Sequence, residues 1–172
     1  MYNYRTICIC GGGGLGHTIA ASLNHNGYQV NLLTGHPEQW SNHIHVTDCN
    51  GTIITGEIAK ISKYPEEVIP FSDIILLCVP GYLIQKLCMQ SPHMLITILR
   101  SVQSLAVVVF SGWLVMSWVR NIGCFGFQRV PYISRVKEYG KSAELKGYNQ
   151  NSRSEATKIV TWKDSPLSSQ KR

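Results

Sequence analysis

The chain has 172 residues, of which 44% are hydrophobic and 15% charged, and this composition suits one globular domain with a buried core. A net charge of +6 would fit nucleic-acid binding, but residues 1–90 hold four basic and six acidic residues. The later basic residues are scattered without interleaved aromatic side chains, so we expect no nucleic-acid partner. The N-terminus has no charged segment followed by a long apolar run, and most of the six cysteines lie within apolar stretches, so we predict a cytoplasmic protein without a signal peptide.

The first three expected elements form a β-α-β unit. Thr6–Cys10 is a continuous apolar run of strand length, which is typical of a strand buried on both faces. His17–Asn26 carries apolar residues at helical spacing, and Asn26-Gly27 is a helix stop signal. Tyr28–Leu33 returns to a strand pattern, so the unit predicts a parallel sheet with a right-handed crossover.

Between the first strand and the helix stands the pattern Gly11-x-Gly13-x-x-Gly16. In a dinucleotide fingerprint the first glycine permits a tight turn, the second lets a pyrophosphate approach the backbone, and the third lets the helix pack closely on the strand. The first helical amides are unpaired donors at the positive end of the helix dipole, which suits an anion. A flexible hinge is the alternative interpretation of the same letters. The candidate cofactor-binding residues of this loop are Gly11, Gly12, Gly13, Gly14, Leu15 and Gly16.

The end of the second strand bears on the choice between NAD and NADP. An acidic residue there would take the ribose hydroxyls of NAD, but the chain reads Leu33-Thr34-Gly35-His36, and Glu38 lies further along. The place of the acid is taken by Thr34, which we therefore include among the cofactor-binding candidates. No arginine replaces the acid, so the sequence leaves NADP or NAD open and favours NADP only slightly.

A β-hairpin is expected next. His43–Asp48 and Thr52–Ile58 alternate between apolar and polar residues, and Asn50-Gly51 between them is a strong turn signal. The alternation of a hairpin strand explains the spacing of His43-x-His45. Cys8 and Cys10 lie on the same face of a strand, which explains their spacing as well, so we predict no metal site.

The clearest buried strand of the sequence is Asp73–Val79, preceded by a short helical segment at Pro65–Ile69. It ends at Pro80-Gly81, where the chain must leave the sheet. Ligands of open α/β folds sit at the carboxyl ends of parallel strands, so we expect Val79 and Pro80 to line the cofactor crevice. A plain strand terminator is the alternative.

Several of these segments together resemble the octopine/nopaline (opine) dehydrogenases. The resemblance is carried by ICICGGGGLGHTIAASL, VNLLT-x-x-PEQW, the hairpin, EVIPFSDIILLCVPG and GFQRVPYISRVKEYGKSA, and covers about residues 1–88 and 124–148. It implies a Rossmann domain of the α/β class, a doubly wound parallel sheet with a β-hairpin insertion, followed in the family by a helical domain. It also implies reductive condensation of an amino acid with a 2-keto acid, with NAD(P)H as reductant.

The second half of the chain departs from that family pattern. We expect a Rossmann domain over 1–148 with an atypical stretch at 90–122, a disordered tail at 149–172, and no counterpart of the family's helical domain, so that no catalytic residue is carried over. Residues 101–119 are uncharged and long enough to span a bilayer, which leaves a membrane-tethered interaction protein as a minor alternative. A non-catalytic nucleotide-binding module or sensor is the other alternative to a truncated oxidoreductase, and the oligomeric state is open.

Overall fold

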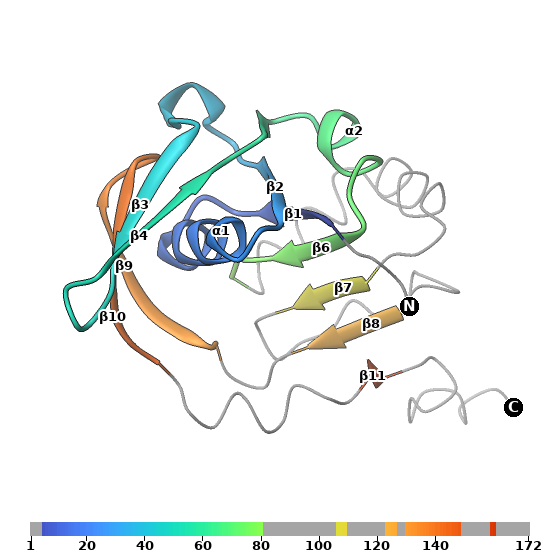
Figure 1. Ribbon diagram of the computed structural model, residues 1–172. Helices are drawn as coiled ribbons and strands as arrows, with labels where there is room; N and C mark the ends of the chain where they lie inside the picture. Colours follow the sequence, from blue (N-terminus) through green and yellow to red (C-terminus); the bar gives the residue numbers. More distant parts are fainter. Residues whose placement is uncertain (1–4, 81–105, 110–122, 127–129, 149–158, 161–172) are drawn as a thin grey trace, which may run out of the picture.

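The computed structural model describes residues 5–80, 106–109, 123–126, 130–148 and 159–160 (Figure 1). They form two sheets with one long helix between them. Most of the expected atypical stretch 90–122 and nearly all of the expected tail 149–172 lie outside the described residues.

The larger sheet has seven strands in the order β11-β8-β7-β6-β1-β2-β5. All neighbouring strands are parallel except β11, which runs antiparallel to β8. The order reverses beside β1, as in a doubly wound sheet, which confirms the expected fold class. Its strands are β1 (Thr6–Cys10), β2 (Gln29–Leu33), β5 (Lys60–Ser62), β6 (Ile74–Leu77), β7 (Ala106–Val109), β8 (Gly123–Gly126) and β11 (Ile159–Val160).

The smaller sheet has four strands in the order β4-β3-β10-β9. The predicted hairpin is confirmed, since β3 and β4 pair antiparallel, but it is only half of this sheet because β3 also pairs in parallel with β10. Nothing local in the hairpin sequence indicates a partner strand so far along the chain. The strands are β3 (His43–Thr47), β4 (Ile53–Glu57), β9 (Tyr132–Glu138) and β10 (Ser142–Tyr148).

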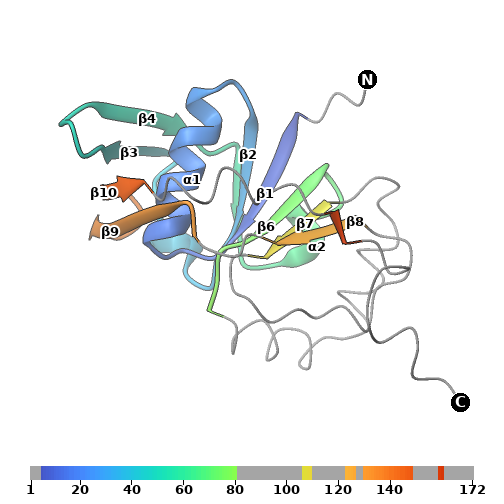
Figure 2. The ribbon, with the colours of Figure 1, turned by 90° about the horizontal axis from the view of Figure 1, so that it is seen from below.

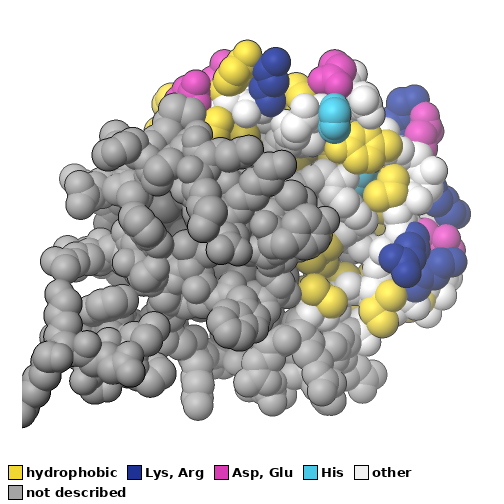
Figure 3. Space-filling model, turned by 180° about the vertical axis from the view of Figure 1, so that it is seen from behind, with side chains coloured by type: hydrophobic (Ala, Val, Ile, Leu, Met, Phe, Trp, Pro, Cys, Tyr) yellow, Lys and Arg dark blue, Asp and Glu magenta, His cyan; other side chains and the backbone are white. Residues whose placement is uncertain are grey.

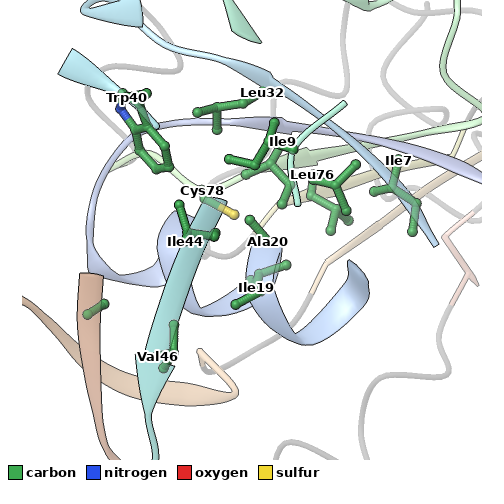
Figure 4. Packing of buried hydrophobic residues seen from close by; sticks show 14 of the residues in the cluster. Ile7, Ile9, Ile19, Ala20, Leu32, Trp40, Ile44, Val46, Leu76 and Cys78 are labelled. Atoms are coloured by element: carbon green, nitrogen blue, oxygen red, sulfur yellow. The ribbon is translucent and has the colours of Figure 1, made fainter. Parts of the chain in front are cut away.

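Helix α1 (Gly14–His25) lies between the two sheets, as two perpendicular views show (Figures 1 and 2). Ile9 and Leu32 of the larger sheet, Ile19 and Ala20 of the helix, and Val46 of the smaller sheet belong to one buried cluster (Figure 4). Because the helix is covered on both sides, its position relative to β1 is fixed by packing. The remaining helical segments are the 3-10 turn η1 (Pro37–Gln39) and α2 (Pro65–Val68).

Strand β7 lies inside the uncharged run 101–119 and pairs in parallel with β6. This part of the run therefore continues the parallel sheet, and the rest of it lies outside the described residues. Within the part of the chain that the structure describes, neither helix has the length and apolar character needed to traverse a bilayer.

Candidate functional site

The glycine loop leaves β1 at the carboxyl ends of three adjacent parallel strands. The amide of Gly11 donates to the carbonyl of Leu33 at the end of β2 (3.0 Å), and the amide of Cys78 after β6 donates to the carbonyl of Cys10 (2.8 Å). The loop thus sits where the strand order reverses, which is the position of ligand sites in open α/β sheets.

Gly11 and Gly16 are required by the protein's own packing. Gly11 has φ +126°, and a Cβ there would lie 2.6 Å from the carbonyl oxygen of Cys78. A Cβ at Gly16 would collide with the carbonyl oxygen of Gly11. The first glycine therefore serves the turn and the third serves close helix packing, as the fingerprint predicts.

Two more glycines of the loop are crowded by residues far along the chain. A Cβ at Gly12 would lie 2.5 Å from the hydroxyl of Tyr139 and 3.0 Å from Oγ1 of Thr34. A Cβ at Gly14 would lie 2.9 Å from the carbonyl oxygen of Ser134 in β9. These two glycines leave room for protein atoms of the β9 segment.

Gly13 differs from the other glycines of the loop because its Cβ direction is open. No atom of the described residues lies within 4 Å of a Cβ built there, and its φ of −80° and ψ of −177° suit any residue. Gly13 is the N-cap of α1, and the first turn of the helix carries no acidic residue. Open space beside unpaired helical amides fits an anion such as a phosphate. Leu15, in the first turn of α1, is partly buried and packs against the core.

His17, which is not among the residues expected at the site, is fully buried beneath this loop. Its Nδ1 lies 2.9 Å from the carbonyl oxygen of Gly13, and its Nε2 accepts a hydrogen bond from the amide of Gly140 at 2.9 Å. Because the backbone amide of Gly140 can only donate, Nε2 must be unprotonated, so Nδ1 carries the proton and donates to the carbonyl oxygen of Gly13. Burial lowers the pKa of His17, against a smaller opposing effect of the bond to Gly13, and the ring is neutral.

Two aromatic rings enclose His17. Trp40 packs against it with ring centroids 4.1 Å apart and the ring planes tilted by 31°, and Tyr139 meets it edge-on at 5.8 Å. Both rings come from segments that carry the family resemblance, PEQW and KEYG. The sequence feature that could have indicated His17 is its position as a polar residue on the buried face of the expected helix.

Thr34 lies at the end of β2, where we expect a contact with ribose, but its side chain faces inward. It is 6% exposed, and its hydroxyl lies 3.4 Å from the hydroxyl of Tyr139. The exposed residues that follow are Gly35, His36, Glu38 and Gln39, and Nδ1 of His36 lies 3.5 Å from Oε1 of Glu38.

Val79 and Pro80 follow β6 beside the loop. The Cγ1 atom of Val79 would lie 2.9 Å from a Cβ at Gly11, and Pro80 is exposed. The neighbouring thiol of Cys78 is buried, which raises its pKa, so it is protonated. Among the residues described, no group of three or more histidine, cysteine or acidic side chains is arranged to hold a metal ion.

Charged side chains on the smaller sheet are mostly paired. Glu144 accepts from Lys146 at 2.8 Å and lies 3.9 Å from Lys137, and the bond from Lys146 lowers the pKa of Glu144. Arg135 is exposed on the edge strand β9, as expected for a solvated strand edge. Basic and acidic side chains are interspersed on the described part of the face in Figure 3.

Comparison with known proteins gives the chain a family. The model of the ketopantoate reductase PanE/ApbA family matches residues 7–96, which is more than half of the chain. The chain belongs to this family. The match includes the glycine loop, the hairpin and β6. No curated protein sequence matches the chain significantly.

Solved structures of PanE/ApbA and opine dehydrogenase proteins share the fold of this family member. Octopine dehydrogenase in complex with NADH and agmatine is 21% identical, with a TM-score of 0.71, over 84% of this chain and 40% of that chain. Yersinopine dehydrogenase with NADP+ bound is 12% identical, with a TM-score of 0.69, over 87% and 40%. A PanE/ApbA family ketopantoate reductase from Ralstonia eutropha JMP134 is 14% identical, with a TM-score of 0.62, over 83% and 47%.

These similarities confirm, at the level of the fold, the expected likeness to the Rossmann domain of opine dehydrogenases. The PanE/ApbA chain matches less than half the length of the three solved proteins.

Proposed function

We propose that this PanE/ApbA-family chain binds NADP or NAD at the glycine loop and acts as the cofactor-binding domain of an oxidoreductase. The observation that carries the proposal is the open Cβ direction of Gly13, the N-cap of α1, in a loop whose other glycines are filled by protein contacts. The solved relatives with NADH or NADP+ bound have the same fold, which supports the choice of ligand.

The residues around the loop fit a dinucleotide. The amides of Gly13 and Gly14 would hold the pyrophosphate at the positive end of the helix dipole. Exposed His36 after β2 would lie toward the adenosine ribose, and Val79 and Pro80 after β6 toward the nicotinamide. When bound, the nicotinamide supplies or accepts a hydride, and the chain contributes binding and orientation.

We propose a modest preference for NADPH over NADH. The residue directly after β2 is Thr34, whose side chain is buried, so no carboxylate at this position takes the ribose hydroxyls or repels a 2′-phosphate. Oε1 of Glu38 lies 3.5 Å from Nδ1 of His36, and both side chains are exposed. We expect the imidazole of His36 to face the 2′-phosphate.

The reaction we favour is reductive condensation of an amino acid with a 2-keto acid. Octopine and yersinopine dehydrogenases match with TM-scores of 0.71 and 0.69, against 0.62 for the Ralstonia eutropha ketopantoate reductase. The family model favours the second candidate, reduction of a 2-keto acid without condensation. A non-catalytic dinucleotide-binding module is the third, and we place all three in the cytoplasm, where the free cysteines stay reduced.

Fluorescence titration of the purified 172-residue chain with NADH and NADPH tests the proposal. We expect saturable binding by the wild type and at least a tenfold loss in Gly13→Val, whose side chain would occupy the space of the pyrophosphate. Gly147→Val is the matched control, because no described atom lies within 4 Å of its Cβ position and it lies on β10, away from the loop. Unchanged affinity in a folded Gly13→Val variant, or no binding by the wild type, would overturn the assignment.

Substrate class is tested by NADPH or NADH oxidation in the presence of pyruvate or 2-oxoglutarate, with and without mixed amino acids. Turnover that requires an amino acid supports condensation. Turnover with the keto acid alone supports simple reduction. Binding without turnover in either arm fits both an isolated cofactor-binding domain and the non-catalytic module.

A further inference from the structure

The ring of His17 is fixed at both nitrogen atoms. Nδ1–H donates to the carbonyl oxygen of Gly13, and Nε2 accepts from the amide of Gly140, each at 2.9 Å. Trp40 packs on one side of the ring and Tyr139 closes another, and the side chain is 0% exposed. A ring held in this way has one orientation and one tautomer.

The bond to Gly13 also supports the orientation of the next amide. The Gly13–Gly14 peptide is trans, since the described residues contain no cis peptide bond, and in a trans peptide the C=O and N–H vectors are opposed. A carbonyl of Gly13 that is directed at His17 therefore turns the N–H of Gly14 the other way, out of the helix N-terminus. The same carbonyl accepts the backbone amide of His17 at 3.1 Å.

We propose that His17 is a positioning residue for the dinucleotide site: its Nδ1–H adds a second hydrogen bond to the Gly13 carbonyl, beside the bond from the His17 backbone amide, and so keeps the Gly14 amide aimed at the pyrophosphate. The inference rests on the proposed function. Gly140 acts from the far side of the ring. It stands at the turn between β9 and β10, with φ +74°, and its amide keeps Nε2 free of a proton.

The turn that presents Gly140 is itself held in place. The carbonyl of Gly140 accepts the amide of Ser41 at 2.9 Å, and a Cβ at Gly140 would collide with the carbonyl oxygen of Gln39. The segment that follows β2 and the β9–β10 turn are thereby joined beneath the glycine loop, with His17 between them and Gly13.

Two amide substitutions separate the two bonds of the ring. The side-chain amide of His17→Asn reaches the place of Nδ1 and can donate to Gly13, whereas that of His17→Gln reaches the place of Nε2 and can accept from Gly140. If His17 positions the loop, His17→Gln should weaken NADPH binding about fivefold to tenfold, the equivalent of one lost hydrogen bond. His17→Asn should stay within about twofold of the wild type.

Thermal unfolding of each variant sets a temperature at which all are folded, and His25→Gln, an exposed histidine at the end of the same helix, is the control. A purely structural role predicts equal losses in the two variants, or losses that follow the melting temperature, and either result overturns the proposal.

Nuclear magnetic resonance of the chain without cofactor gives a second readout. The ¹⁵N shifts of the wild-type ring should show a proton on Nδ1, and the Gly14 amide shift should move in His17→Gln but remain in His17→Asn. A proton on Nε2 would overturn the proposal without any variant. Absence of NADH and NADPH binding by the wild type would instead overturn the proposed function, while the Gly14 shift would still decide whether His17 orients the loop.

Discussion

Gly16→Ala should destabilise the fold by about 2 kcal/mol, although alanine is the better helix former. In an exposed helix the change would stabilise by roughly 1 kcal/mol. Here the new methyl group would collide with the carbonyl oxygen of Gly11, and Ile9 lies behind it with its Cγ2 atom 3.8 Å away. The helix cannot simply move outward, because α1 is packed against the smaller sheet on its other side. Overpacking of this kind costs about 1–3 kcal/mol and sometimes more, which outweighs the gain in propensity.

Urea unfolding followed by circular dichroism measures the effect, with Gly13→Ala as the matched control. The same chemical change at Gly13 meets no described atom and requires no positive φ. The poorer N-cap preference of alanine is offset by the lower entropy of its unfolded chain, so we expect a change in unfolding free energy within about 0.5 kcal/mol. Equal stability of Gly16→Ala and the wild type, at an unchanged m-value, would refute the argument that α1 is pinned against the turn.

Two further perturbations address stability elsewhere. Asp73→Ala should cost about 1–3 kcal/mol in urea unfolding, because its Oδ2 accepts the amides of Arg5 and Thr6 at 3.0 Å each and anchors the start of β1; an unchanged midpoint would contradict that role. The pKa of His17 is lowered in the folded state, so the unfolded state binds more protons. Stability that is present above pH 6.5 should therefore be lost as the pH falls through the folded pKa. The unfolding free energy should change by up to about 1.4 kcal/mol per pH unit. His17→Asn should flatten this dependence, and an equally steep profile in that variant would assign the effect to another group.

The parts of the fold predicted from sequence are those that neighbouring residues determine. The β-α-β unit follows from apolar periodicity, and the roles of Gly11 and Gly16 follow from the geometry of a strand that turns into a helix packed on it. The hairpin follows from alternation around Asn50-Gly51, and Gly51 indeed has φ +83°.

The parts that were missed depend on contacts over long sequence separations. Gly12 and Gly14 are crowded by Tyr139 and Ser134, and His17 is bonded to Gly140, 123 residues away. No local sequence pattern indicates which distant segment will pack on a helix N-terminus. The pairing of β3 with β10 cannot be predicted locally for the same reason. A polar residue on the core face of a helix is the one local sign that such a contact exists.

The burial of Thr34 limits what this residue can contribute to cofactor choice. A residue directly after the second strand is expected to reach the ribose, yet the hydroxyl of Thr34 is buried against Tyr139 and beside Gly12. A carboxylate introduced at this position would lose its hydration under the loop before it met a ribose hydroxyl, and it would press on the segment that supports His17. His36 and Glu38 are exposed at this end of β2. Under the proposed function, we expect these exposed residues rather than the buried threonine to discriminate between a ribose hydroxyl and a 2′-phosphate.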